Sequence, residues 1–258
     1  METEETVKEG LVTASKAKSI WLAFVDIVLF AVLSMIFLFL FAIPFALVFP
    51  ELKTEVGETN IYFQMLNEVL MLVSGLIAAC MVLGFRKLPF SGLGLSLKGW
   101  GRSLLRGALF VVFLYVVGFG LSLLLGAVEV VGFLFSPISL LVSLLLYFFV
   151  AVTEEVIGRG FILGRMLDGG INKFVALFIS AVLFSLMHLF NPNFAFVPFL
   201  NIMLAGCFLG ASYIYTRNLC FPIALHWFWN WIQGSVLGYK VSGYEFRNET
   251  MLILHFPE

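Results

Sequence analysis

Charged residues are scarce in this chain, and the shortage indicates its class. Only 12% of the 258 residues are Asp, Glu, Lys or Arg, about half the fraction that is usual for a soluble domain. Hydrophobic residues make up 61%, and apolar runs of about 20 residues recur along the whole chain. The runs are continuous and do not alternate with polar residues, so they predict transmembrane helices rather than transmembrane strands. We therefore expect a polytopic α-helical membrane protein.

Other features are also missing, and each absence excludes a class. The formal net charge of −1 leaves no surplus of positive charge, so nucleic acid is not an expected partner. The three cysteines, Cys80, Cys207 and Cys220, form no C-x-x-C pair, and we expect buried free thiols instead of a disulfide or zinc framework. The acidic start of the chain fits no cleavable signal peptide, and the C-terminus carries no lipidation box. The first apolar run is therefore expected to be a retained span.

The apolar runs divide the chain into candidate spans, with Gly, Pro and Asn at the breaks, as in "DGGIN" and "TRN". The pattern predicts an all-α transmembrane bundle of about seven spans, with eight possible, at roughly 20–49, 61–84, 104–128, 137–168, 172–190, 194–216 and 220–239. We expect a cytosolic segment at 1–19, a single transmembrane domain at 20–240 with its motif-bearing core at 138–231, and a C-terminal tail at 241–258.

Lysine and arginine predict the orientation, because they gather in loops on the cytoplasmic side. With seven spans and a cytoplasmic N-terminus, eleven of them fall inside: Lys8, Lys16, Lys18, Arg86, Lys87, Lys98, Arg102, Arg106, Arg165, Lys173 and Arg217. Three fall outside: Lys53, Lys240 and Arg247. We therefore expect a multi-pass integral membrane protein, in the cell membrane if the source is prokaryotic, with its N-terminus inside. One missed or re-entrant helix would reverse the C-terminal half.

The stretch "VTEEVIGRGF" places three charges in one of the most apolar parts of the chain. A charge within the hydrocarbon costs about 2.5 kcal/mol or more, so it usually marks a function or an internal pair. On a helix, Glu155 and Arg159 are four residues apart and can neutralise each other, which predicts a supporting structural ion pair. Glu154 points about 100° away, and its own neighbour four residues on is Gly158. Glu154 is therefore the candidate functional carboxylate.

Two of the three histidines also stand within apolar segments. His255 lies in the predicted tail, whereas His188 and His226 do not. A lone buried histidine usually has a structural role in the core, but two of them together with an unpaired carboxylate indicate a site. Glu154 and His188 each lie 17 residues from Ile171, the centre of the "DGGIN" turn, so an antiparallel helical hairpin would place them at the same height.

Neighbours one helical turn away complete the candidate site. Asn230 faces the same way as His226, and Phe184 the same way as His188, which makes Phe184 a supporting residue. A carboxylate, two imidazoles and an amide are suited to activating water and to binding a developing oxyanion. Alternatively, Glu154, His188 and His226 match a catalytic zinc ligand set with an open position. No H-E-x-x-H motif decides between these two chemistries.

Three ordered motifs resemble one family. "EEVIGRG", "FSLMH" and "HWFWN" resemble the E-E-x-x-x-R, F-x-x-x-H and H-x-x-x-N/B motifs of the CPBP family, also called Abi. This family contains the type-II CAAX prenyl endopeptidases and their bacterial and archaeal relatives. The resemblance runs from about Ile138 to Trp231, and the segment "LGLSLKGW" is also similar to a common upstream feature. Three motifs in the right order are far more specific than any one of them.

The resemblance implies a role for each matched residue. Glu154 corresponds to the catalytic glutamate and general base, and His188 to the histidine that positions the water. His226 and Asn230 correspond to the pair that binds the oxyanion, while the second glutamate and the arginine of the first motif are supporting. The family is named for metalloproteases, although a metal-free glutamate mechanism is also argued for it. We expect no metal or other cofactor, with a divalent metal such as zinc as the alternative.

The resulting hypothesis is an intramembrane endopeptidase. Its partners would be the lipid bilayer and a membrane-embedded or lipidated peptide, either a prenylated C-terminus or a small secreted or signalling peptide. A proton-coupled transporter would also place glutamate and histidine near the midplane, but it predicts internal repeats and broken helices in matching halves, which the sequence does not contain. A membrane scaffold or immunity protein that keeps the protease fold without activity is the third alternative.

Overall fold

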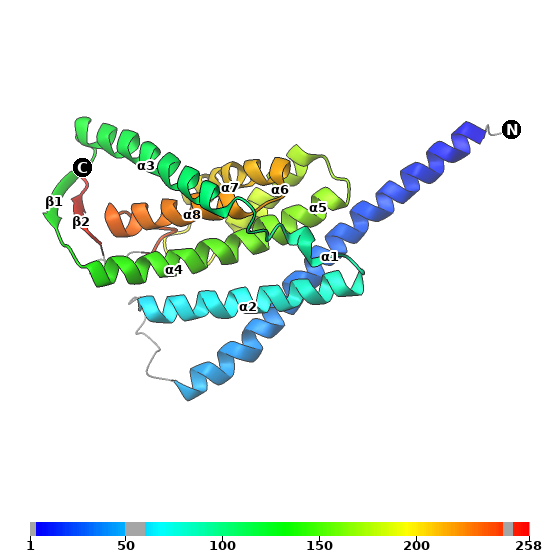
Figure 1. The fold of residues 1–258 in the computed structure, drawn as a ribbon, viewed down its shortest axis with the longest axis horizontal. Helices are drawn as coiled ribbons and strands as arrows, with labels where there is room; N and C mark the ends of the chain where they lie inside the picture. The colour runs from blue at the N-terminus through cyan, green and yellow to red at the C-terminus, as the bar shows by residue number, and fades with distance from the viewer. Residues whose placement is uncertain (1–3, 50–59, 245–249, 258) are drawn as a thin grey trace.

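The structure is a computed structural model that describes residues 4–49, 60–244 and 250–257. It shows an integral membrane protein built from α-helices (Figure 1). Its helices are α1 (Glu4–Val48), α2 (Ile61–Phe85), α3 (Trp100–Leu124), α4 (Pro137–Glu155), α5 (Gly164–Asp168), α6 (Lys173–Leu186), α7 (Phe196–Thr216) and α8 (Cys220–Trp231). Shorter segments are the 3-10 turn η2 (Phe90–Leu93) and the π-helices η3 (Val156–Leu163) and η4 (Ile232–Val236). Lys53 and Arg247, both used to predict the orientation, lie outside the described residues.

The helical bundle predicted from the apolar runs is confirmed. Within the described residues, five helical stretches are long and apolar enough to cross a membrane, namely 17–48, 61–85, 100–124, 137–168 and 196–216. Two predicted spans are shorter than expected. The sixth helix in the series, α6, has only 14 residues, and α8 has 12 before it continues as η4. Helix α1 also begins well before the apolar run from which it was predicted.

The breaks in the sequence end the helices by recognisable means. In "DGGIN", Gly170 adopts a left-handed conformation with φ of 82°, and the Asn172 side chain accepts a hydrogen bond from the backbone N–H of Phe174 to cap α6. In "TRN", Arg217 adopts a left-handed conformation and ends α7. Ser136 caps the N-terminus of α4, and Pro137 occupies the first turn of this helix. These turns let α4, α6, α7 and α8 fold back on one another.

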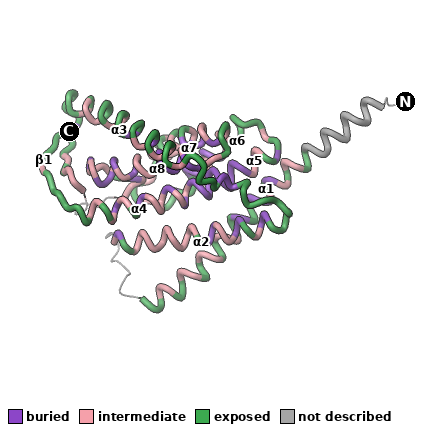
Figure 2. The backbone as a smooth tube through the Cα atoms, viewed as in Figure 1, coloured by how far each residue is buried: buried purple, intermediate pink, exposed green. Residues whose placement is uncertain are grey.

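The core lies around η3, in the second half of the fourth long apolar stretch of the bundle. All eight residues of this π-helix are buried, whereas outward-facing residues of α1 are exposed, such as Trp21 at 67% and Leu47 at 74% (Figure 2). Exposed apolar side chains of this size on a helical bundle are the surface that lipid covers. Helix α4 packs against α2 and α8, and α3 packs against α8 (Figure 1).

A small sheet accompanies the helices. Strands β1 (Glu129–Phe133) and β2 (Leu252–His255) pair antiparallel, so that Glu129 stands opposite His255. The tail predicted from residue 241 therefore contains an ordered strand that returns to the segment before α4. The apolar-run criterion does not detect strands of four or five residues.

A buried charged cluster ties α1 to α2 and α5. Asp26 in α1 is fully buried, and both of its carboxylate oxygens accept hydrogen bonds from guanidinium groups. Arg86 Nε lies 2.6 Å from Oδ1, and Arg165 Nη2 lies 2.8 Å from Oδ2. Arg217 and Asp168 form a further ion pair next to Arg165. The cluster closes the end of the bundle where the chain turns from α5 to α6.

Candidate active site

The first motif spans the change from α-helix to π-helix. Glu154 and Glu155 are the last two residues of α4, and Arg159 lies in η3. Hydrogen bonds in a π-helix join residues five apart instead of four, and such segments are frequent at functional sites. It turns the side chains that follow the two glutamates, and all of η3 is buried. Apolar periodicity alone does not predict this irregularity.

Glu155 and Arg159 form the ion pair that the sequence predicts. Arg159 Nη1 lies 2.8 Å from Glu155 Oε1, and the two side chains are 1% and 0% exposed. Arg159 also donates to the carbonyl oxygen of Gly206 at 3.1 Å, and its guanidinium stacks over the Phe184 ring at 4.1 Å. A buried guanidinium is tolerated only where its donors are satisfied in this way. Phe184 is therefore supporting in a specific sense, because it covers the cation.

Glu155 also holds His226, a contact that the sequence does not predict. His226 Nδ1 lies 2.9 Å from Glu155 Oε1. An ionised carboxylate only accepts hydrogen bonds, so Nδ1 carries the hydrogen and donates it. This contact fixes the ring and directs Nε2 toward Glu154. The adjacent pair of glutamates therefore acts on His226 from two sides.

Glu154 stands between the two imidazoles without touching either directly. Its Oε1 lies 3.7 Å from His188 Nε2, and its Oε2 lies 3.7 Å from His226 Nε2. Both separations exceed a hydrogen bond, and a polar separation of this size is suited to a bridging water. The Glu154 side chain is 14% exposed, whereas that of Glu155 is fully buried. Neighbouring carboxylates in the sequence thus have different surroundings.

His188 is oriented by the residue one turn earlier. Helix α6 ends at Leu186, so His188 lies just beyond the helix, although the predicted span continued to residue 190. Its Nδ1 lies 2.8 Å from the carbonyl oxygen of Phe184, and the two rings are 5.0 Å apart. A carbonyl oxygen can only accept, so Nδ1 donates, and Nε2 is left facing Glu154. The spacing of four residues predicts this contact correctly.

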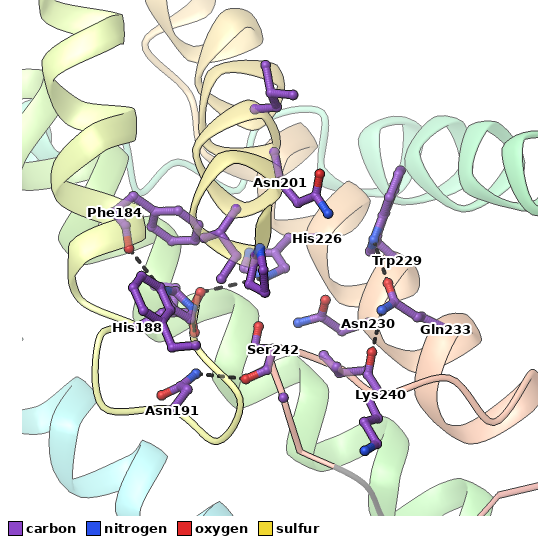
Figure 3. Close-up of a pocket in the computed structure, with 18 of the residues that line it drawn as sticks. Phe184, His188, Asn191, Asn201, His226, Trp229, Asn230, Gln233, Lys240 and Ser242 are labelled. Carbon is purple, nitrogen blue, oxygen red and sulfur yellow. Dashed lines mark hydrogen bonds and ion pairs between the residues drawn. The ribbon is translucent and has the colours of Figure 1, made fainter. Parts of the chain in front are cut away.

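One cavity of about 780 Å³ brings the four motif residues together (Figure 3). Glu154, His188, His226 and Asn230 all line it, and Asn230 follows His226 by one turn of α8. The cavity continues past side chains that the motifs do not include, among them Asn191, Asn201, Trp229, Gln233 and Lys240. Much of the remaining lining is apolar, including Phe208 and Leu209.

Gln233 organises the wall of this cavity. Its Oε1 accepts hydrogen bonds from Tyr115 at 2.8 Å and from Trp229 Nε1 at 2.9 Å, and its Nε2 donates to the carbonyl oxygen of Lys240 at 2.7 Å (Figure 3). Asn191 donates to the carbonyl oxygen of Ser242 at 3.0 Å. These bonds hold the chain after η4 against the cavity. An amide within the apolar run that forms α8 and η4 is the sequence signal that could have identified Gln233.

The arrangement of ligand-type side chains bears on the zinc alternative. In the part of the chain that the structure describes, no three His, Cys, Asp or Glu side chains are arranged to hold a metal ion. The Nδ1 atoms of both histidines are engaged by Phe184 and Glu155, so only the Nε2 atoms face Glu154.

Comparison with known proteins agrees with the motifs. Residues 136–232 match the family model described as Type II CAAX prenyl endopeptidase Rce1-like. Searches of curated proteins and of solved structures found no match. The matched residues include α4, η3 and α8 and contain Glu154, His188, His226 and Asn230. The segment that builds the candidate active site is therefore similar to the Type II CAAX prenyl endopeptidase Rce1-like family model.

Proposed function

We propose that this protein is an intramembrane endopeptidase that cleaves a membrane-associated peptide with water activated by Glu154 and His188. The observation that carries the proposal is the 3.7 Å separation of Glu154 from His188 Nε2 at the wall of a cavity inside an apolar bundle. A water between the two would donate one hydrogen to the carboxylate and the other to the imidazole nitrogen. Such a water is held by two bases and is aligned for proton transfer.

In the proposed reaction the water loses a proton to Glu154 as its oxygen attacks the carbonyl carbon of the scissile peptide bond. The electron pair of the C=O bond moves to the carbonyl oxygen and forms a tetrahedral oxyanion. When this intermediate collapses, the C–N bond breaks, and the proton on Glu154 passes to the leaving amine. The products are a carboxylic acid and an amine, the acid then passes its proton to the amine or to water, and Glu154 is regenerated as the carboxylate.

His226 and Asn230 are proposed to stabilise the oxyanion. As an oxyanion donor, His226 would carry a hydrogen on each ring nitrogen, with Nδ1 donating to Glu155 and Nε2 donating to the substrate oxygen. The Asn230 side chain is 8% exposed and lines the same cavity, so its amide can donate to a substrate oxygen. Both donors come from α8, and their spacing is preset before substrate binds.

The cavity supports a peptide substrate within or attached to the bilayer. Amide side chains such as Asn191 and Asn201 can hydrogen-bond both the N–H and the C=O groups of an extended peptide, and the apolar wall suits its side chains or a lipid anchor. A prenylated C-terminus of the CAAX type is one such substrate, and a small secreted or signalling peptide is another. No metal is required by this mechanism, and we propose a metal-free enzyme.

The orientation with a cytoplasmic N-terminus also belongs to the proposal. It rests on the eleven Lys and Arg residues that fall in segments on the same side of the membrane as the N-terminus. Single cysteines in residues 88–100, placed in a variant without Cys80, Cys207 and Cys220, should resist an impermeant thiol reagent in intact cells. Labelling of these positions from outside would contradict the orientation.

The proposed function is tested with purified protein and a panel of lipidated and unlipidated peptides, read by mass spectrometry. We expect cleavage at one position of at least one membrane-attached peptide, and none with Glu154→Ala. Cleavage that persists in Glu154→Ala would contradict the proposed base. A phenotype in cells that survives this substitution would favour the scaffold or immunity alternative.

A further inference from the structure

A third glutamate approaches the site from outside the matched segment. Glu68 lies in α2, within a helix that is otherwise almost free of charge, and none of the three motifs includes it. The family match begins only at residue 136. Helix α2 packs along α4, the helix that carries Glu154 and Glu155. An ionisable side chain within the bilayer is costly in free energy, so its presence in α2 usually indicates a function.

A hydrogen bond fixes the backbone of Glu68 at the level of the site. The Thr153 hydroxyl donates to the carbonyl oxygen of Glu68 at 3.2 Å, and Thr153 itself is fully buried. Thr153 directly precedes Glu154 in the sequence. The bond therefore ties α2 to α4 beside the proposed base, and a shift of one helix along the other would break it.

The carboxyl group of Glu68 lies on the side of α2 that faces the site. Glu154 and His188 are within electrostatic range of it. Its Oε2 atom is buried and has no hydrogen-bond partner among the described residues. Buried carboxyl oxygens are nearly always hydrogen-bonded, so this atom is free to take a partner that the described side chains do not supply.

We propose that Glu68 is a positioning residue of the active site, whose carboxyl group fixes the Glu154 carboxylate and the His188 imidazole from the side of α2. The inference rests on the proposed function of Glu154 and His188. Phe184 fixes His188 at Nδ1, and the imidazoles of His188 and His226 lie on either side of Glu154. None of these contacts limits movement of the Glu154 and His188 side chains toward α2, and Glu68 supplies that restraint.

Physical chemistry explains why a carboxyl group serves here better than an apolar side chain. Two carboxyl groups that interact through apolar surroundings repel each other unless a hydrogen lies between them. A hydrogen bond relayed from Glu68 through one water would remove the repulsion and give Oε2 its partner. It also stops the Glu154 carboxyl group from rotating away from the cavity. An amide can make such a bond, whereas a leucine cannot.

The test uses Glu68→Leu, Glu68→Gln and the matched control Asn67→Leu, whose side chain points about 100° away on α2. The chain has only three histidines, so protein labelled with ¹⁵N-histidine gives three sets of imidazole signals. We expect Glu68→Leu to shift the signals of His188 while those of His255 in β2 stay unchanged. Glu68→Gln should give signals closer to those of the wild type, and Asn67→Leu should leave all three sets in place.

Activity and melting complete the test. With a cleaved peptide in hand, Glu68→Leu should lower kcat by about 10- to 100-fold with little change in KM, as expected when a reacting group is displaced. Its thermal midpoint should equal or exceed that of the wild type, because leucine removes an unpartnered buried polar atom. Glu68→Gln should recover most of kcat.

Several results would overturn the inference. Unmoved His188 signals in Glu68→Leu would show that Glu68 does not position the site. A lowered thermal midpoint or unfolding of Glu68→Leu, or no recovery by Glu68→Gln, would show that the residue is structural. The imidazole signals and the melting need no substrate. If no peptide is cleaved by the wild type, the proposed function fails on its own, and these two measurements still decide the role of Glu68.

Discussion

Two buried charged clusters in this bundle differ in how closely their charged groups approach one another. Around Asp26, guanidinium groups contact both carboxylate oxygens directly, at 2.6 and 2.8 Å, and no part of Asp26 is exposed. Around Glu154, two imidazole nitrogens stand back at 3.7 Å, and the carboxylate lines a cavity. Both clusters carry charge into an apolar bundle. In the first the charges neutralise one another in contact, and in the second room is left for a molecule between them.

The difference separates a structural cluster from a reactive one. Direct ion pairs offset the cost of burying charge and join helices, as Asp26 joins α1 to α2 and α5. A carboxylate kept apart from its neighbours stays available for proton transfer. Both arrangements occur at adjacent residues, because Glu155 contacts Arg159 and His226 directly whereas Glu154 makes no direct contact with its histidine neighbours.

The largest expected effect follows from breaking the reactive cluster. Glu154→Ala and His188→Ala should reduce peptide cleavage to background, because each removes one of the two groups that hold the water. Cleavage is measured by mass spectrometry on the peptide panel. Glu129→Ala, on the exposed strand β1, is a matched control that removes a carboxylate away from the cavity and should keep full activity. Retained cleavage in either site variant would contradict the assignment.

A smaller loss of activity is expected at Asn230. Removing one donor to an oxyanion typically costs about 10²- to 10³-fold in rate, so Asn230→Ala should retain measurable cleavage. The measurement is kcat on the best peptide, with Asn67→Ala as the control because that amide lies in α2 and does not line the cavity. Complete loss of activity with a native melting profile would place Asn230 among the groups that hold the water.

The structural cluster should respond in stability and not in chemistry. Asp26→Asn leaves Arg86 and Arg165 without their carboxylate, and we expect it to lower the free energy of unfolding by about 1.5–3 kcal/mol. Thermal melting in detergent checks this, and kcat of the folded fraction should be unchanged. A variant that melts like the wild type but loses activity would contradict the separation of the two clusters.

No effect is expected from removing metal. Among the described side chains, no three are arranged to hold a metal ion, and the proposed reaction uses protein groups alone. Cleavage should therefore survive incubation with a strong chelator, and added zinc should not raise it. Loss of activity on chelation, with recovery on adding zinc, would instead support Glu154, His188 and His226 as ligands.

The fold was predictable where apolar runs are long, and less so where they are interrupted. Lipid selects 20-residue apolar helices directly, so the long helices α1 to α4 and α7 follow from composition. The short helix α6 and the π-helices η3 and η4 depend on contacts with neighbouring helices, which composition does not encode. The pairing of β1 with β2 joins segments more than a hundred residues apart and leaves no local signal.

The site was predictable through its motifs but not through its supports. The spacing about Ile171 brings Glu154 to within 3.7 Å of His188, and the pairing of Glu155 with Arg159 follows from a spacing of four. The contact of His226 with Glu155 depends on how α8 meets α4, which no spacing specifies. Asp26 and Glu68 also stand in apolar runs, yet they belong to no motif, so only the packing of α1 and α2 reveals what they touch.

The most direct test compares Glu154→Gln with Glu155→Gln, two nearly isosteric changes at adjacent positions. Thermal melting and peptide cleavage are measured on both purified variants. Glu154→Gln should melt like the wild type and cleave nothing, because only the proposed base is lost. Glu155→Gln strands the buried Arg159 cation and should lower the free energy of unfolding by about 3–5 kcal/mol. The reverse pattern, a destabilised Glu154→Gln that still cleaves beside a stable and inactive Glu155→Gln, would contradict the account.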